Sequence, residues 1–408
     1  MALLHLSVNA GAGIPKALVP ATTLRGSFAE FTPVDSNDGA VAKSELQAIR
    51  RYPMHGNKRP SAGKVDRRTF LQQTGRSTLT AGAVFCAPAT MAWAEQSAIS
   101  ADLTIPQVSS PESLVKLLYE SFSPGQLETV CFDWDYQEEN RGLLRTRVAN
   151  NWDITDHFIN DEFYSADQRA LVRAIFEGIF HPEWHERIDK QLEDDSGGFG
   201  ESNSIAIFGK PGSDKFEFVL TGRHMTVRCD GNTAEHVAFG GPIFYGHAAD
   251  GFDEGPNHPG NVFWPQAVEA NKLYQALDGK QQRLALIQKG LPHESQAGFQ
   301  GAEGKFQGIP LAELSPDQRQ RVQDVLKKLV EPYRQCDREE VTSCLKSQGG
   351  LDACHLAFYQ QGDIGKDGVW DNWRLEGPSF VWHFRGAPHV HVWVNVADNP
   401  SMNFNAKR

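Results

Sequence analysis

The sequence predicts an α+β fold in which helices pack around a largely antiparallel sheet to form a single large domain. Apolar residues make up 40% of the 408 residues, including 24 Phe and 9 Trp, so a sizeable core is available. Stretches with helical spacing come early and in the middle, whereas strand-like stretches come in the middle and at the end. That order is typical of α+β proteins rather than of alternating βαβ units.

Four stretches have the apolar spacing of amphipathic helices. They are residues 111–127, a stretch after Ser165, residues 261–289 and a stretch after Ser315. In the second and fourth, a Gln follows the Ser by three residues, so each can form a capping box at the helix start. Pro316 fits the first turn of the fourth helix.

Strands are predicted in two blocks. Residues 204–208 and 216–228 alternate and flank a turn-forming stretch at 209–213. Residues 380–396 supply the last two strands, joined around residues 386–388. These blocks indicate antiparallel pairing.

Two stretches rich in glycine are predicted to be long surface loops. Residues 186–202 are acidic and then glycine-rich, and residues 290–308 are rich in Gly and Gln.

The N-terminal region has the features of a twin-arginine export signal. Residues 66–71 read Asp-Arg-Arg-Thr-Phe-Leu, a weakly apolar stretch follows, and Ala92-Trp93-Ala94 is a small-x-small cleavage pattern. These three parts in this order predict a signal over residues 54–94 that the twin-arginine translocation machinery reads.

The signal begins well inside the chain, which bears on where translation starts. Met54 is followed by a short basic stretch that suits the head of a signal, so we expect translation to start there. Residues 1–53 would then be an upstream extension. The mature domain would span residues 95–408 and be periplasmic or secreted.

Composition excludes two classes of partner. The net charge of −11 would repel phosphate backbones, so we expect no nucleic acid partner. Uninterrupted apolar runs are too short for an ordinary membrane span, so we expect no stable membrane insertion. An oxidising compartment would permit a disulfide among Cys336, Cys344 and Cys354.

The last predicted strand carries the most informative pattern. His389 and His391 are two residues apart, so their imidazoles would project from the same face of a strand. Val390, Val392 and Val394 would line the opposite, buried face. Two neighbouring imidazoles are a good start for a metal site, but two ligands do not hold an ion.

Other histidines can complete the ligand set. We expect His224 to join from the middle strand, with a further ligand or a supporting contact from His247, His258 or His383. Three protein ligands and one open position are the usual arrangement of a catalytic metal. The alternative is that each histidine only bonds to backbone or caps a turn.

Charged residues in the same predicted strands are candidates for the chemistry. Arg223 and Arg385 could clamp a substrate carboxylate, and Glu376 could serve as a general acid or base. Structural ion pairs and solvated loop charges are the alternatives. The motifs of serine hydrolases, HExxH zinc proteases, P-loop enzymes and dinucleotide enzymes are missing from the sequence.

Five short motifs resemble the DUF3500 family of exported proteins, and the resemblance covers roughly residues 110–398. The motifs are Phe208-Gly-Lys-Pro-Gly212, Gly222-Arg-His-Met-Thr226, Gly241-Pro-Ile-Phe-Tyr-Gly-His247, Arg374-Leu-Glu-Gly-Pro378 and His389-Val-His-Val-Trp393. The family carries no assigned function. Many members have a carboxylate where this chain has His383, so the resemblance implies a ligand set richer in His here. That favours copper or zinc over calcium or magnesium.

Together these patterns predict a periplasmic metal-dependent enzyme that acts on a small-molecule substrate. We expect an oxidoreductase that uses a His-ligated transition metal, with copper favoured and zinc or iron as alternatives. A metal-dependent hydrolase is the second hypothesis. A non-catalytic periplasmic protein that binds a ligand or a metal is the third.

Overall fold

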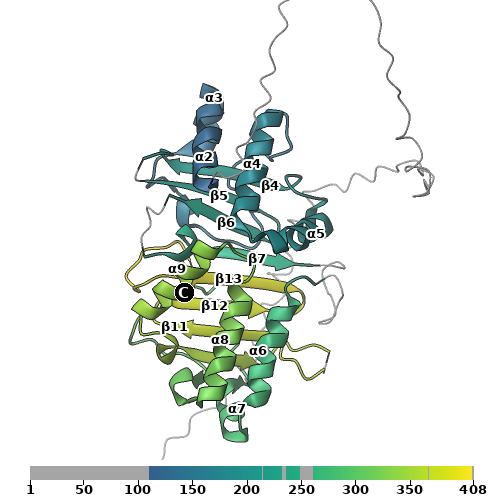
Figure 1. The fold of residues 1–408 in the computed structure, drawn as a ribbon, viewed down its shortest axis with the longest axis vertical. Helices are drawn as coiled ribbons and strands as arrows, with labels where there is room; N and C mark the ends of the chain where they lie inside the picture. The colour runs from purple at the N-terminus through teal and green to yellow at the C-terminus, as the bar shows by residue number, and fades with distance from the viewer. Residues whose placement is uncertain (1–109, 214, 232–235, 249–260, 366, 407–408) are drawn as a thin grey trace, which may run out of the picture. The chain divides into compact units, whose positions relative to one another are not determined.

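The computed structural model describes most of the chain after the predicted signal. The described residues are 110–213, 215–231, 236–248, 261–365 and 367–406. The predicted extension, the signal, Met54 and His258 lie outside them. Within the described residues, eight α-helices and an 11-stranded, mostly antiparallel sheet form one domain, which confirms the α+β prediction (Figure 1). No helix among these residues is long and apolar enough to cross a membrane.

The helices fall into an early and a late group. The early helices are α2 (Pro111–Ser121), α3 (Pro124–Val130), α4 (Ala166–Ile179) and α5 (His185–Ser196). The late helices are α6 (Trp264–Ala276), α7 (Gly279–Ala285), α8 (Pro316–Val330) and α9 (Gln335–Ser347).

The sheet consists of two blocks of strands that meet at its centre. The first block is β1 (Cys131–Phe132), β4 (Asn203–Gly209), β5 (Phe216–Gly222), β6 (Met225–Asp230) and β7 (Ile243–His247). The second is β13 (Val390–Val396), β12 (Phe380–Arg385), β11 (Asn372–Gly377), β10 (His355–Tyr359) and β8 (Leu286–Ile287), with β9 (Ile309–Pro310) also on β10. Among these described strands, only β1–β4 and β8–β10 pair in parallel. A separate hairpin pairs β2 (Gln137–Glu138) with β3 (Gly142–Leu143).

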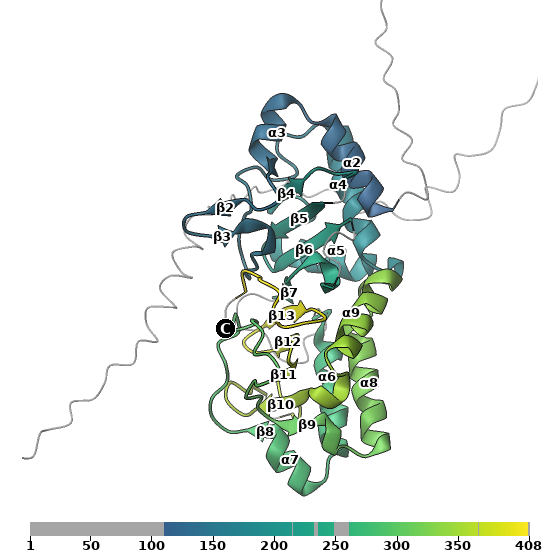
Figure 2. The ribbon, with the colours of Figure 1, turned by 90° about the vertical axis from the view of Figure 1, so that its left-hand side faces the viewer.

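The two faces of the sheet are covered differently. Figure 2 shows α2, α4, α5, α6, α8 and α9 along one face. The main core lies there, and Val390, Val392 and Val394 contribute to it as the alternation predicted. On the opposite face, Trp393 and Phe244 pack against segments without regular structure. This second face carries the candidate site.

The polar caps at the helix starts follow the sequence rules. Ser165 and Ser315 both form capping boxes with the Gln three residues on, which confirms the predicted starts of α4 and α8. The single helix predicted over residues 111–127 is wrong, because the chain breaks after Ser121. Ser123 caps a new helix there, with Pro124 in its first turn.

Two further predictions are corrected by the structure. Residues 216–228 form two strands rather than one, because the chain turns at Arg223 and His224. The loop predicted over residues 186–202 contains α5, whose inward residues Ile188, Gln191 and Leu192 have helical spacing. Gly197 ends that helix in the left-handed conformation.

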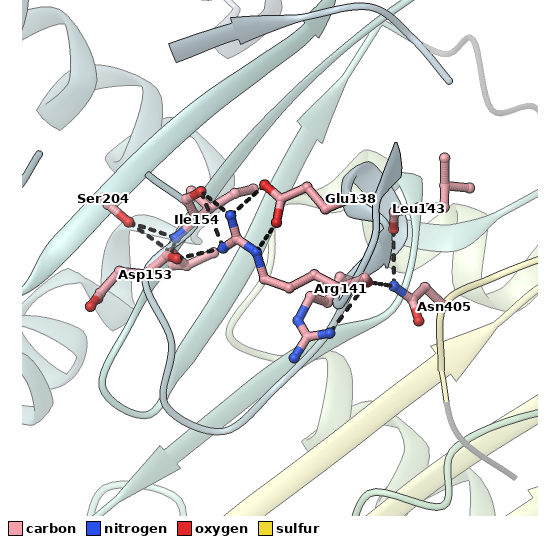
Figure 3. A network of polar contacts seen from close by, with 9 residues as sticks. Glu138, Arg141, Leu143, Asp153, Ile154, Ser204 and Asn405 are labelled. Carbon is pink, nitrogen blue, oxygen red and sulfur yellow. Dashed lines mark hydrogen bonds and ion pairs between the residues drawn. The ribbon is translucent and has the colours of Figure 1, made fainter. Parts of the chain in front are cut away.

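A polar network fixes the β2–β3 hairpin and the C-terminal segment against the second face (Figure 3). Arg141 forms an ion pair with Glu138 and donates to the backbone oxygen of Asp153 at 3.0 Å. The next residue, Ile154, donates its N–H to Ser204 Oγ on β4 at 2.9 Å. Asn405 donates to the backbone oxygen of Leu143 at 3.1 Å. These bonds hold the segment 141–154 in place, and this segment includes Asn150, which contacts the candidate site.

Candidate metal centre

His224 lies in the two-residue turn between β5 and β6, not within a strand. Gly222 and Met225 are the last paired residues, and His224 has a φ of 55°, in the left-handed region. Its N–H donates to the backbone oxygen of Asn150 at 3.0 Å, and its C=O accepts from Gly246 N–H at 3.1 Å. Both backbone groups of this conformation are therefore held by neighbouring segments.

His389 immediately precedes β13 and His391 is the second residue of that strand, which pairs with β7. His391 is opposite Gly246 in that pairing. A Cβ on Gly246 would run into the backbone oxygen of Val390 and would lie 3.4 Å from ring carbons of both His224 and His391. Only glycine at position 246 therefore allows the imidazoles to meet over β7.

The structure brings His224, His389 and His391 together, as the sequence predicted. His391 Nε2 lies 2.9 Å from His389 Nε2 and 3.0 Å from His224 Nε2. The candidate ligand atoms all lie within 4.8 Å of one another. The three side chains are buried, with exposed fractions of 5%, 2% and 3% for His224, His389 and His391. We call this group the His triad.

These distances fit a bound ion. Bonds of about 2.0–2.1 Å from a metal to imidazole nitrogens place two such nitrogens about 2.9 Å apart at a right angle and about 3.4 Å apart at a tetrahedral angle. The observed Nε2 separations of 2.9 and 3.0 Å lie at the short end of that range. The rings therefore need little movement to coordinate an ion.

Two carboxylates lie behind the His triad. His391 Nδ1 is 2.7 Å from Glu294 Oε2, and His224 Nδ1 is 3.0 Å from Asp195 Oδ2. If each Nδ1 is the protonated nitrogen, each Nε2 presents a lone pair to the other. Two lone pairs 3.0 Å apart repel unless a cation lies between them. Carboxylates in this position are typical of metal-bound histidines.

Burial and nearby charges set the protonation states of His391 and Asp195. Burial lowers the pKa of His391 well below its ordinary value, and the nearby Arg385 adds to this. Burial alone would raise the pKa of Asp195, but His224, Gln191 and His247 together outweigh it, so the pKa of that carboxyl is lowered. His391 is therefore neutral and Asp195 ionised near neutral pH, as metal binding requires.

No sequence pattern points to Asp195 or Glu294. Asp195 lies at the end of α5, in a stretch predicted to be a loop, where Gln191 Nε2 and Ala248 N–H also donate to it. Glu294 lies in the predicted loop 290–308. The helical spacing of Ile188 and Leu192 was the available signal for α5, whereas the long-range position of Glu294 had none.

The structure does not bring His247 and His383 into the His triad. His247 is at the end of β7, and its Nε2 is 3.0 Å from Asp194 Oδ2. His383 lies on β12, where its Nδ1 is 3.4 Å from Arg374 Nη1. His258 lies outside the described residues.

The charged candidates lie at unequal distances from the His triad. Arg385 Nη1 is 3.0 Å from Glu294 Oε2, so this arginine contacts a carboxylate behind the triad. Arg223 Nε is 3.9 Å from Asp195 Oδ1 and the side chain reaches the surface. Glu376 is on β11, paired with Arg374 Nη2 at 2.8 Å. The arginines therefore border the candidate centre, and Glu376 borders a separate pocket.

Stability should fall on acidification because of buried histidines. Burial lowers the pKa of His383 well below the ordinary value of 6.5. Below pH ~6.5 the unfolded chain binds protons that the folded chain excludes, so the free energy of unfolding decreases as pH falls. We expect chelator-treated protein to lose urea resistance between pH 7.5 and 5, and His383→Gln to reduce this slope by up to ~1.4 kcal/mol per pH unit. An unchanged slope in His383→Gln would contradict the lowered pKa of His383.

No two cysteines among the described residues form a bridge. Cys336, Cys344 and Cys354 are free thiols, as are Cys131 and Cys229. Burial raises the pKa of Cys344 and Cys354 to about 12, so these thiols are protonated and unreactive near neutral pH.

Comparison with known proteins places the chain in a family. The family model described as "Protein of unknown function (DUF3500)" matches residues 113–399. No curated protein and no solved structure matches the chain significantly. The match spans both blocks of the sheet and includes all three histidines of the triad. The chain therefore belongs to the DUF3500 family.

Proposed function

We propose that this protein is a metal-dependent enzyme in which the His triad holds one transition-metal ion. The observation that carries the proposal is the convergence of three buried imidazoles from two separate blocks of the sheet, with Asp195 and Glu294 behind two of them. Structural zinc sites usually have four protein ligands, whereas catalytic sites keep one position open. The group found among the described residues has three. That number supports a catalytic centre that acts on a small-molecule substrate.

The donor set favours a subset of metals. Three imidazoles without a thiolate suit copper, zinc, nickel or iron better than calcium or magnesium. Among divalent first-row ions, copper binds such nitrogen sites most tightly. We therefore infer that copper is the preferred ion and that oxidation–reduction is the favoured reaction class.

A second candidate, zinc-dependent hydrolysis, is supported by the carboxylates. Glu294 and Asp195 make the imidazoles more basic and orient them, an arrangement that recurs in zinc enzymes. A zinc ion with an open position supplies an acidic bound water. In this chain, Glu294 and Asp195 would hold the Nδ1 protons and keep the two rings in place.

The experiment that tests the proposal is metal analysis of protein purified without a His tag. One equivalent of copper or iron with charge-transfer or ligand-field absorption would support the oxidoreductase. One equivalent of zinc in a colourless protein would support the hydrolase. A tightly bound metal without turnover of any substrate class would favour a non-catalytic binding protein. If the protein binds none of these ions, the proposal is wrong.

The two carboxylates should control metal affinity without being ligands. Asp195→Asn and Glu294→Gln keep the side-chain shape but remove the charge behind His224 and His391. We expect each to weaken metal binding by about 10–100-fold. Competition with a chromophoric chelator measures this change, and Glu183→Gln, at an exposed position, is the matched control. Equal affinities in all four proteins would contradict the assigned role.

We also propose that the protein is exported by the twin-arginine route and acts in the periplasm or outside the cell. The paired arginines Arg67 and Arg68 and the Ala92-Trp93-Ala94 pattern support this. This route carries folded proteins, so a metal could be inserted before export. Mass spectrometry of the exported protein should find a new N-terminus near Glu95. A peptide from residues 1–50 in the precursor would contradict a start at Met54.

A further inference from the structure

A pocket of about 610 Å³ lies on the same face of the sheet as the His triad. Its lining includes Arg374 and Glu376 from β11, and the rest comes from the segment 290–307. Both β11 side chains are largely buried, whereas Glu303 and Lys305 are exposed. The pocket therefore has a charged floor on the sheet and a charged mouth on the segment. Its volume is in the range of small-molecule sites.

Hydrogen bonds hold the walls of this pocket in place. Glu376 Oε1 accepts from Arg374 Nη2 and from Gln300 Nε2, both at 2.8 Å. Gln300 Oε1 accepts in turn from Lys305 N–H at 3.2 Å. At the other end, Gln307 accepts from Tyr359 Oη–H at 2.9 Å. Two sets of bonds thus hold the segment to the sheet at the two ends of the pocket, so the pocket is built before a ligand arrives.

The lining indicates the charge of the ligand. Two cations, Arg374 and Lys305, face the pocket together with two anions, Glu376 and Glu303. Side-chain amides fill much of the remaining wall, and no aromatic side chain lines it among the described residues. The Nε of Arg374 is buried without a hydrogen-bond partner, so its donor capacity is not fully used. Because Arg374 and Gln300 already donate to Glu376, the unused donors suit a carboxylate next to peptide groups.

The same segment connects the pocket to the His triad. Pro292 and Gln296 line the pocket, and Glu294 between them contacts His391. On the sheet, Arg374 is opposite His383 on β12, and His383 is opposite Trp393, two residues after His391 on β13. Two strand spacings and a two-residue offset separate Arg374 from His391 by roughly 12 Å along the sheet. An extended peptide of about four residues spans that distance.

We propose that this pocket binds the carboxylate end of a short peptide as the substrate-recognition site of the metal centre. Arg374 and Lys305 would take the carboxylate and the glutamine amides the neighbouring peptide groups, and the peptide would extend from there toward the His triad. The part of this inference that names a substrate rests on the proposed function. The binding itself depends only on the pocket.

The test uses tri-alanine as the probe and saturation-transfer NMR and calorimetry on the full mature protein. N-acetyl-tri-alanine amide, which lacks both terminal charges, and maltotriose, which is polar and uncharged, are the comparison ligands. We expect tri-alanine to bind more tightly than either. Equal binding of maltotriose or of the capped peptide, or no binding of tri-alanine, would overturn the proposal.

Variants separate the pocket from the metal centre. Arg374→Ala should weaken tri-alanine binding by about tenfold or more, since it removes a charged hydrogen-bond partner. Lys305 is exposed, so Lys305→Ala tests the mouth of the pocket without risk to the fold. This variant should weaken tri-alanine binding by a smaller factor. Lys346→Ala, on α9 and outside this pocket, should have no effect. An affinity unchanged in both Arg374→Ala and Lys305→Ala would assign the peptide to another site.

The two proposals can fail independently. Tri-alanine should bind equally to chelator-treated wild type and to His391→Ala, because neither change alters the pocket lining. Peptide binding in a protein that never takes up a metal would keep the pocket and reject the enzyme. Metal uptake without peptide binding would reject the pocket alone.

Discussion

Replacing His391 by Ala should remove the metal from the protein. His391 is the central member of the His triad, since its Nε2 lies within 3.0 Å of the Nε2 atoms of both His224 and His389. The variant would leave two imidazoles, and two ligands do not retain an ion against a chelator. We expect metal content to fall from one equivalent to none by mass spectrometry. We also expect the loss of metal-dependent thermal stabilisation, about 2.7 kcal/mol when the free ion is at 100 times its dissociation constant.

A control substitution at His157 distinguishes loss of the metal from a general loss of stability. His157 lies against the ring of Phe163 and is outside the His triad, so His157→Ala should keep its metal. In metal-free form, His391→Ala and wild type should have similar circular dichroism, because the site is on the face away from the main core. If His391 has only a structural role, metal content would be the same in both variants and in wild type. Stability alone would then fall by roughly 1–3 kcal/mol.

Local sequence patterns were sufficient for the starts of two helices and for one half of the site. The capping boxes at Ser165 and Ser315 gave the starts of α4 and α8, because their hydrogen bonds close within one turn. The spacing of His389 and His391 gave their common face, because side chains alternate along a strand. Each of these inferences uses only neighbours in sequence.

The remaining features depend on contacts between distant segments. Residues 216–228 alternate without a strong turn signal, which predicts a strand position for His224. Its left-handed turn is instead held by Asn150 and Gly246, far away in the sequence. Glu294 lies 97 residues from His391, and no local rule could bring them together. Long-range packing, which periodicity does not report, therefore decides the composition of the site.

The His triad lies where the two blocks of the sheet meet. His224 belongs to the first block, and His389 and His391 belong to the second. The first block reaches this junction through β6 and β7, which share only the residue pairs Met225–Tyr245 and Thr226–Phe244. A metal at this place would crosslink the β5–β6 turn to β13. Metal binding and the stability of the junction are therefore expected to depend on each other.

Substitution of Glu217 is expected to have the largest effect on stability, because this residue forms buried ion pairs within the first block. Its side chain is 0% exposed and forms ion pairs with Arg145 at 3.1 Å and with Arg228 at 3.0 Å. Arg228 also donates to the backbone oxygens of Pro242 at 2.7 Å and Arg147 at 2.6 Å, which connects β6 to the start of β7. Glu217→Gln would leave two buried guanidinium groups without an anion. Such a change costs about 3–5 kcal/mol, because a buried charge without its partner remains desolvated.

Chemical and thermal unfolding of the purified variant measure this cost. We expect the melting temperature of Glu217→Gln to fall by roughly 10 °C, whereas Glu183→Gln, at an exposed position, should stay within about 0.5 kcal/mol of wild type. Adding Arg145→Met to Glu217→Gln removes one of the two uncompensated charges. The double variant should therefore be more stable than the sum of the single effects predicts. Additive losses, or a Glu217→Gln variant as stable as the control, would show that this carboxylate does not neutralise the arginines.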